Sequence, residues 1–177
     1  MRHLLKIVFV ILISLFSEAK SQIVSSDFNF HETKISNSGC SYELPFSNIE
    51  FEKSFSEDSS ILWTNESESG NYIFGIILVK LNEALDIEDD ALGLLESYLD
   101  FLKGEWGVTG AKGYNQTIKL KSNSDVIGIQ DTWSINDDLT AIQSWINNQF
   151  LVVMYIDGNN IADHVSETYF QGFQFAK

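Results

Sequence analysis

The stretch 126-VIGIQDTWSINDDLTAIQSWINNQFLVVMYID-157 decides the fold, because it holds three apolar runs separated by two short turns. The runs are Val126–Ile135, Leu139–Ile146 and Phe150–Ile156, and the residues between them are mostly Asn and Asp. These residue types favour tight turns, and tight turns join neighbouring antiparallel strands. The stretch therefore predicts an antiparallel meander.

Further strands are predicted outside this stretch. Tyr72–Leu81 is a long run with apolar residues in both phases, which indicates a central strand covered on both faces. The alternation in Ile49–Phe55 and the short run Ile61–Trp63 predict two more strands. The composition of Glu66–Asn71 predicts a turn, and the alternation in Tyr114–Leu120 predicts another strand.

Two helices are predicted beside these strands. Ala91–Leu102 repeats apolar residues every three or four positions, which is the period of an amphipathic helix. Asp86 can cap its start, and Lys103 and Gly104 can end it. A second helix is predicted after Asn160, followed by a short terminal strand. This order of elements predicts an α+β fold with a central antiparallel β-sheet flanked by helices.

The first helix has one apolar stripe. Leu95, Tyr98 and Leu102 lie on the same side of a helix with this period. We expect the stripe to pack on the long strand around Ile76.

A lipocalin-like β-barrel is the competing fold. The number of strands favours it, and so does the Gly104-Glu105-Trp106 segment. In lipocalins, however, a glycine–tryptophan motif precedes the strands, whereas here it follows a helix in the middle of the chain. The barrel therefore ranks second.

The first residues have the pattern of an export signal. Arg2, His3 and Lys6 make a short basic start, Leu4–Phe16 is almost unbroken apolar sequence, and small and polar residues follow. That run is shorter than the ~20 residues of a membrane-spanning helix. We expect a signal peptide at 1–22, an N-terminal arm at 23–48 and a single α+β domain at 49–177. The protein would then be secreted or periplasmic, without stable membrane insertion after signal removal.

The charge balance restricts the partners. The chain has 25 acidic and 11 basic residues, a net charge of −14. Residues 1–22 hold three of the basic residues and one acidic residue, so their removal leaves −16. This charge repels phosphate backbones and anionic lipids, and it therefore argues against nucleic-acid binding. It is compatible with a cationic protein as partner, with divalent metals, or simply with high solubility, which is the commonest explanation of such a charge.

Catalytic and metal-binding motifs are missing from the sequence. After export only two histidines, His31 and His164, and one cysteine, Cys40, remain, and there is no Gly-x-Ser-x-Gly motif. An acidic loop beginning at Asp157 has Thr168 where a calcium-binding EF-hand needs glutamate. We therefore predict no catalytic residue, no metal site and no cofactor. A pair of catalytic carboxylates stays open, because its spacing is spatial rather than sequential.

The tryptophans are the candidate ligand-binding residues. All four stand in or beside predicted strands, where aromatic rings most often fill the core. A sheet face lined with tryptophan can also stack a sugar or hold a small apolar ligand. The candidates are Trp63, Trp106, Trp133 and Trp145.

The C-terminal two-thirds of the chain resembles the superfamily of the extrinsic photosystem II protein PsbP. The resemblance lies in the spacing of an F-x-K-x-F segment, a long strand, a helix, a meander and a last helix: Phe51, Lys53, Phe55, Tyr72, Leu95–Leu102, Trp133, Trp145 and Tyr169–Phe173. It implies an α/β/α sandwich with a central antiparallel sheet and a non-catalytic assembly or binding role. No motif for binding the photosystem is present.

These observations favour an exported, non-enzymatic binding or accessory protein. The alternative, from a different class, is a small secreted hydrolase with a carboxylate-based active site. A deep pocket with convergent carboxylates would favour the hydrolase, and a filled core with shallow grooves would favour the binding protein.

Overall fold

The structure is a computed structural model that describes residues 28–45, 49–85, 91–115, 118–123, 125–135 and 138–177. The predicted signal peptide and the predicted cap Asp86 lie outside these residues. The elements, in chain order, are β1 (His31–Lys34), β2 (Ser41–Leu44), β3 (Glu52–Phe55), β4 (Ile61–Ser69), β5 (Tyr72–Lys80), α1 (Ala91–Glu105), β6 (Gly110–Ala111), β7 (Ile127–Ile135), β8 (Asp138–Ile146), β9 (Phe150–Asp157) and α2 (Asp163–Gln171).

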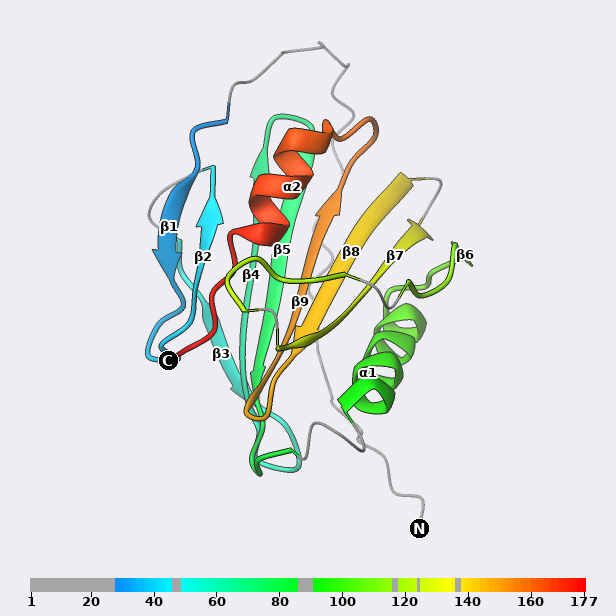
Figure 1. Ribbon diagram of the computed structural model, residues 1–177. Helices are drawn as coiled ribbons and strands as arrows, with labels where there is room; N and C mark the ends of the chain where they lie inside the picture. The colour runs from blue at the N-terminus through cyan, green and yellow to red at the C-terminus, as the bar shows by residue number, and fades with distance from the viewer. Residues whose placement is uncertain (1–27, 46–48, 86–90, 116–117, 124, 136–137) are drawn as a thin grey trace.

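A seven-stranded antiparallel sheet forms the centre of the molecule (Figure 1). Its strand order is β3-β4-β5-β9-β8-β7-β6, and β1 and β2 form a separate two-stranded sheet. The predicted meander is confirmed as β7, β8 and β9, and β9 also pairs with β5. Within the described residues neither sheet closes into a barrel, so the lipocalin-like alternative is wrong. The fold is α+β.

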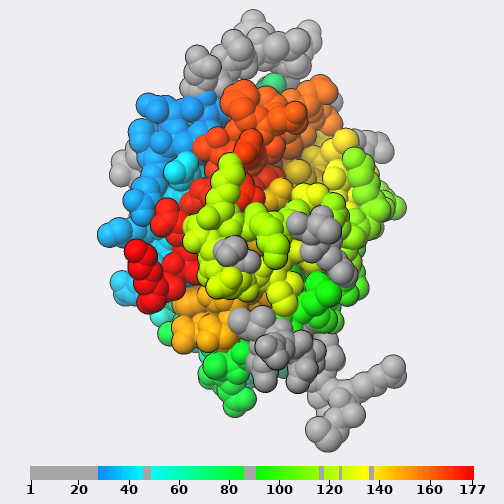
Figure 2. Space-filling view, viewed as in Figure 1, coloured from blue at the N-terminus to red at the C-terminus, as the bar shows by residue number. Residues whose placement is uncertain are grey.

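Each face of the large sheet carries a helix. Alternate residues of β9 point to opposite faces, so that Val152 and Leu151 belong to different core clusters. One face packs against α1, and we call it the α1 face. The other packs against α2 and the β1–β2 hairpin, and we call it the hairpin face. Figure 2 shows the cover of the hairpin face, with the hairpin in blue to cyan, α2 in orange and residues 118–123 in yellow-green.

Helix α1 lies over β7 and β8 rather than over β5. Leu95 and Leu102 are buried as expected, whereas Tyr98 is only half-buried and Leu99 takes its place in the core. The predicted partner Ile76 points to the hairpin face, because Ile77 and Val79 are the residues of β5 on the α1 face. The expected contact with Ile76 is therefore wrong.

The end of α1 also differs from the expectation. The helix continues through Gly104, and the left-handed residue is Gly107, with φ 65°. The amide of Val108 donates to the carbonyl oxygen of Lys103, and the amide of Gly107 donates to that of Gly104. This is a Schellman motif. It places Trp106 at the last turn of the helix, facing the sheet.

Two predictions, the turn at Glu66–Asn71 and the strand at Tyr114–Leu120, are wrong for the same reason. Strand β4 runs through Glu66–Ser69, so only Gly70 and Asn71 make the turn. Tyr114–Leu120 is not a strand over its described residues, which contribute only isolated bridges of Asn115 and Leu120. In both places the local pattern was ambiguous, and pairing with neighbouring strands decided the structure.

The hairpin of β1 and β2 lies within residues 23–48, the region that the sequence analysis assigns to an N-terminal arm. Ile35, Tyr42 and Leu44 in or beside it are fully buried. The terminal segment pairs with it, since Ser41 and Gln174 exchange backbone hydrogen bonds of 3.0 and 2.8 Å. The predicted terminal strand is reduced to this single bridge.

Candidate functional site

The four candidate tryptophans do not form one surface. Trp63 and Trp145 belong to the core of the hairpin face, and Trp133 is fully buried on the α1 face. Trp106 is only half-buried, and its ring packs edge-on against Trp133 at 5.4 Å. Trp106 is therefore the one tryptophan of the four that can offer ring surface to a ligand. Ligand binding by these residues stays a prediction.

A row of paired residues crosses the α1 face beside Trp106. Glu66 of β4, Gly75 of β5 and Tyr155 of β9 are aligned in the register of the sheet. A β-carbon on Gly75 would overlap the ring of Tyr155, so only glycine leaves room for that ring to lie across β5. The Tyr155 hydroxyl then reaches β4 and donates to Oε2 of Glu66 at 2.6 Å.

The adjacent row adds more carboxylates. Glu68, Ile73 and Asp157 are aligned in it, and Asp138 lies at the start of β8 on the same face. The Trp106 ring lies 4.9 Å from that of Tyr155, centroid to centroid, so Trp106 contacts the residue whose hydroxyl binds Glu66. We call the resulting group the acidic corner, formed by Glu66, Glu68, Asp138, Asp157, Tyr155 and Trp106.

Electrostatic repulsion acts within the acidic corner. Burial raises the pKa of Asp157, and the charges of Asp138 and Glu66 raise it further, against hydrogen bonds from Thr140 and the backbone. Burial, together with Glu66 and Asp157, also raises the pKa of Tyr155 well above its usual value. A positive charge placed here would relieve this repulsion.

Lys103, a lysine of helix α1, is already paired. Nζ of Lys103 lies 3.2 Å from Oδ2 of Asp131 and 3.4 Å from Oδ1 of Asp100. The Asp131 side chain is fully buried, and it also accepts hydrogen bonds from the amide of Gly113 and from Nε1 of Trp133. This network ties α1 to β7, and it leaves Lys103 engaged rather than available to the acidic corner.

Nucleophilic and metal-binding groups are not assembled elsewhere in the described ranges. Cys40 is buried, its Sγ accepts a hydrogen bond from the amide of Ala176, and burial raises the pKa of its thiol. Its raised pKa keeps the thiol protonated and unreactive. Among the described residues no group of three His, Cys, Asp or Glu side chains is placed to hold a metal ion.

Sequence reasoning missed Glu66, Tyr155 and Asp157 as a group. Glu66 was assigned to a turn, and the other two were read as a strand end and a loop. The signal that could have found them is Gly75, a glycine inside the most β-rich run, which indicates close approach of another group.

Comparisons with known proteins do not identify a family for this chain. No protein-family model matches the chain, and no curated protein is similar to it. The described helices include none that is both long and apolar enough to cross a membrane. The proposal for function therefore rests on the geometry of the acidic corner.

Proposed function

We propose that this chain is an exported, non-enzymatic binding protein that captures a cationic protein partner at the acidic corner. One observation carries the proposal. Four carboxylates and the half-buried ring of Trp106 share one end of the α1 face, and Lys103 of helix α1 is committed to Asp131 and Asp100.

The chemistry of the acidic corner suits a lysine or arginine side chain. Carboxylates accept charge-assisted hydrogen bonds from such a group, and a tryptophan face attracts a cation at about 0.5–2 kcal/mol. Binding would also offset the repulsion that raises the pKa of Asp157. The net charge of −14 steers a cationic partner toward the protein and makes its association rate depend on salt.

A small sugar or apolar ligand is the neutral alternative for Trp106. Such a ligand would stack on the same ring, but its affinity would not change with salt. Salt dependence therefore separates the two classes of ligand.

A carboxylate hydrolase is the second candidate function, and the raised pKa of Asp157 favours it. A carboxyl group whose pKa is raised by burial and by carboxylate neighbours moves toward the range in which it can act as a general acid. If the chain hydrolyses glycosides, Asp157→Asn abolishes that turnover. The excess of carboxylates over other catalytic groups in the acidic corner suits a cationic partner as well as it suits acid–base chemistry, so turnover of a substrate is what would separate the two functions.

The relationship to the PsbP superfamily is part of the same proposal. An open antiparallel sheet with α1 on one face and α2 on the other is what an α/β/α sandwich requires, and this supports it. The relationship implies an accessory role without catalysis, in agreement with capture of a partner.

The proposal is tested with Trp106 and a defined probe. A short labelled oligolysine peptide is titrated into the protein, and its fluorescence anisotropy gives the affinity. Trp106→Ala is expected to weaken binding about tenfold or more, because buried aromatic anchors dominate interface energies. Trp106→Phe keeps an aromatic ring and is expected to retain most of the affinity.

Controls exclude unfolding and non-specific attraction. Circular dichroism checks that Trp106→Ala keeps the fold, and a Gly-Ser peptide of equal length checks that the probe binds through its charge. Equal affinity of the wild type and Trp106→Ala for oligolysine would refute the assignment of the acidic corner.

A further inference from the structure

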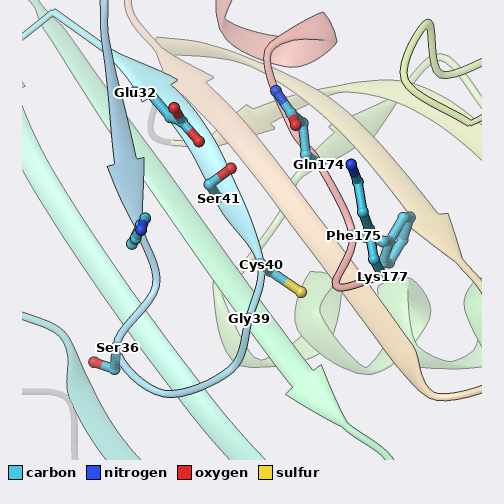
Figure 3. A pocket seen from close by; sticks show the side chains of 9 residues that line it. Glu32, Ser36, Gly39, Cys40, Ser41, Gln174, Phe175 and Lys177 are labelled. Atoms are coloured by element: carbon cyan, nitrogen blue, oxygen red, sulfur yellow. The ribbon is translucent and has the colours of Figure 1, made fainter.

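A hollow of about 420 Å³ lies on the other side of the molecule, between the β1–β2 hairpin and the C-terminal segment (Figure 3). Lys34, Ser41, Gln174 and Lys177 line it, together with Glu32. It belongs to the layer that covers the hairpin face, so the large sheet separates it from the acidic corner.

The register of the small sheet aligns three polar residues across this hollow. Lys34 pairs with Ser41, and Ser41 pairs with Gln174. Tyr42 and Leu44 point from β2 into the core, so the alternate residue Ser41 points to the outer face with its two neighbours. Figure 3 shows Ser41 on the hairpin next to Glu32, with Gln174 opposite on the C-terminal segment.

These residues have unused hydrogen-bond donors. Ser41 is only 8% exposed, and its hydroxyl has no hydrogen-bond partner among the described residues. Lys34 and Lys177 form no salt bridge within the described ranges, although acidic residues are in large excess and Glu32 lines the same hollow. The Ser41 hydroxyl is not one of the enclosed polar atoms that lack a partner, so it opens to the hollow and can donate to a group bound there.

We propose that this hollow binds a small oxyanion, the phosphate or carboxylate group of a small molecule. Two ammonium groups, the Ser41 hydroxyl and the Gln174 amide provide donors on the hairpin and on the C-terminal segment, and an oxyanion accepts hydrogen bonds from such groups. Two lysines and one glutamate line the hollow, although acidic residues outnumber basic ones in the chain as a whole. This site is independent of the capture of a cationic partner.

The test is a titration of the whole chain with inorganic phosphate and, separately, with acetate. Binding is followed by the NMR shifts of the Ser41 and Gln174 amides. Saturable shifts at these two residues are expected, and the stronger of the two ions identifies the group. Lys34→Gln/Lys177→Gln is expected to weaken that binding about tenfold or more, because charged hydrogen bonds are lost. Ser41→Ala is expected to weaken it less.

The matched control removes the same charge elsewhere. Lys80→Gln/Lys112→Gln changes two exposed lysines that do not line the hollow, and phosphate binding is expected to persist. Binding is also expected to persist in Trp106→Ala, which separates this site from the acidic corner. Shifts that do not saturate with either ion, or equal losses in both double variants, would overturn the proposal.

Discussion

At the scale of the residue, the acidic corner depends on Gly75. The ring of Tyr155 occupies the space that any side chain at this position would need, and the hydroxyl of that ring reaches Glu66. Because Gly75 has no side chain, the Tyr155 ring of β9 can lie across β5 and contact Glu66 of β4. Neither the polar Glu66 nor the aromatic Tyr155 reveals this contact when each is considered in its own segment.

Gly75→Ala is expected to destabilise the protein by about 1–3 kcal/mol or more, because it overpacks a buried site. Gly93→Ala is the control. Gly93 lies exposed in α1 with open space around its α-carbon, so alanine there is expected to stabilise the helix by ~0.5–1 kcal/mol. Urea denaturation measures both, and equal effects of the two variants would contradict the described packing.

Asp157→Asn is expected to raise the melting temperature at neutral pH. The pKa of Asp157 is raised in the folded protein, so the folded state binds its proton more tightly than the unfolded state. Stability at this site therefore falls as pH rises from the unfolded value, about 3.9, through the raised folded value. The asparagine side chain in Asp157→Asn does not ionise, so this variant avoids the loss of stability at neutral pH.

The pH dependence of that variant provides its own control. Below the unfolded pKa both forms of residue 157 are uncharged, so the difference in melting temperature is expected to shrink. Glu57→Gln removes an exposed charge outside the acidic corner, and it is expected to leave the curve unchanged. A lower melting temperature for Asp157→Asn at neutral pH would show that this carboxylate stabilises the fold.

At the scale of the element, periodicity predicted α1 and the meander correctly but could not say which strand the helix covers. The stripe of α1 faces the large sheet, yet it lies over β7 and β8 rather than over β5, and Ile76 of β5 points to the opposite face. Helix position depends on pairing between distant strands, and no local pattern encodes it. The same limit explains why Tyr114–Leu120 alternates without forming a strand.

Leu95→Ala is expected to destabilise the protein by about 2–5 kcal/mol, since Leu95 is fully buried between α1 and the sheet. Leu92 on the same helix is half-buried, and Leu92→Ala is expected to have a smaller effect. Guanidinium denaturation midpoints provide the comparison. A midpoint unchanged by Leu95→Ala would mean that α1 does not dock as described.

At the scale of the whole molecule, composition suggests a class of partner, and topology gathers the residues proposed to bind it. An excess of acidic residues is compatible with a cationic partner wherever those residues lie. The alignment of β4, β5, β9 and β8 brings four of them to one end of the α1 face. The other candidate tryptophans turned out to be buried, because one-dimensional patterns do not distinguish core rings from surface rings.

Association kinetics test the central claim most directly. The rate at which oligolysine binds is measured by stopped flow at increasing salt for the wild type, Glu66→Gln/Asp157→Asn and Glu57→Gln/Glu83→Gln. Both double variants remove two negative charges, but only the first removes them from the acidic corner. If the acidic corner captures the cation, the rate falls with salt and the first double variant binds clearly more slowly than the second. Equal rates for the two double variants, or a rate that does not change with salt, would contradict the account.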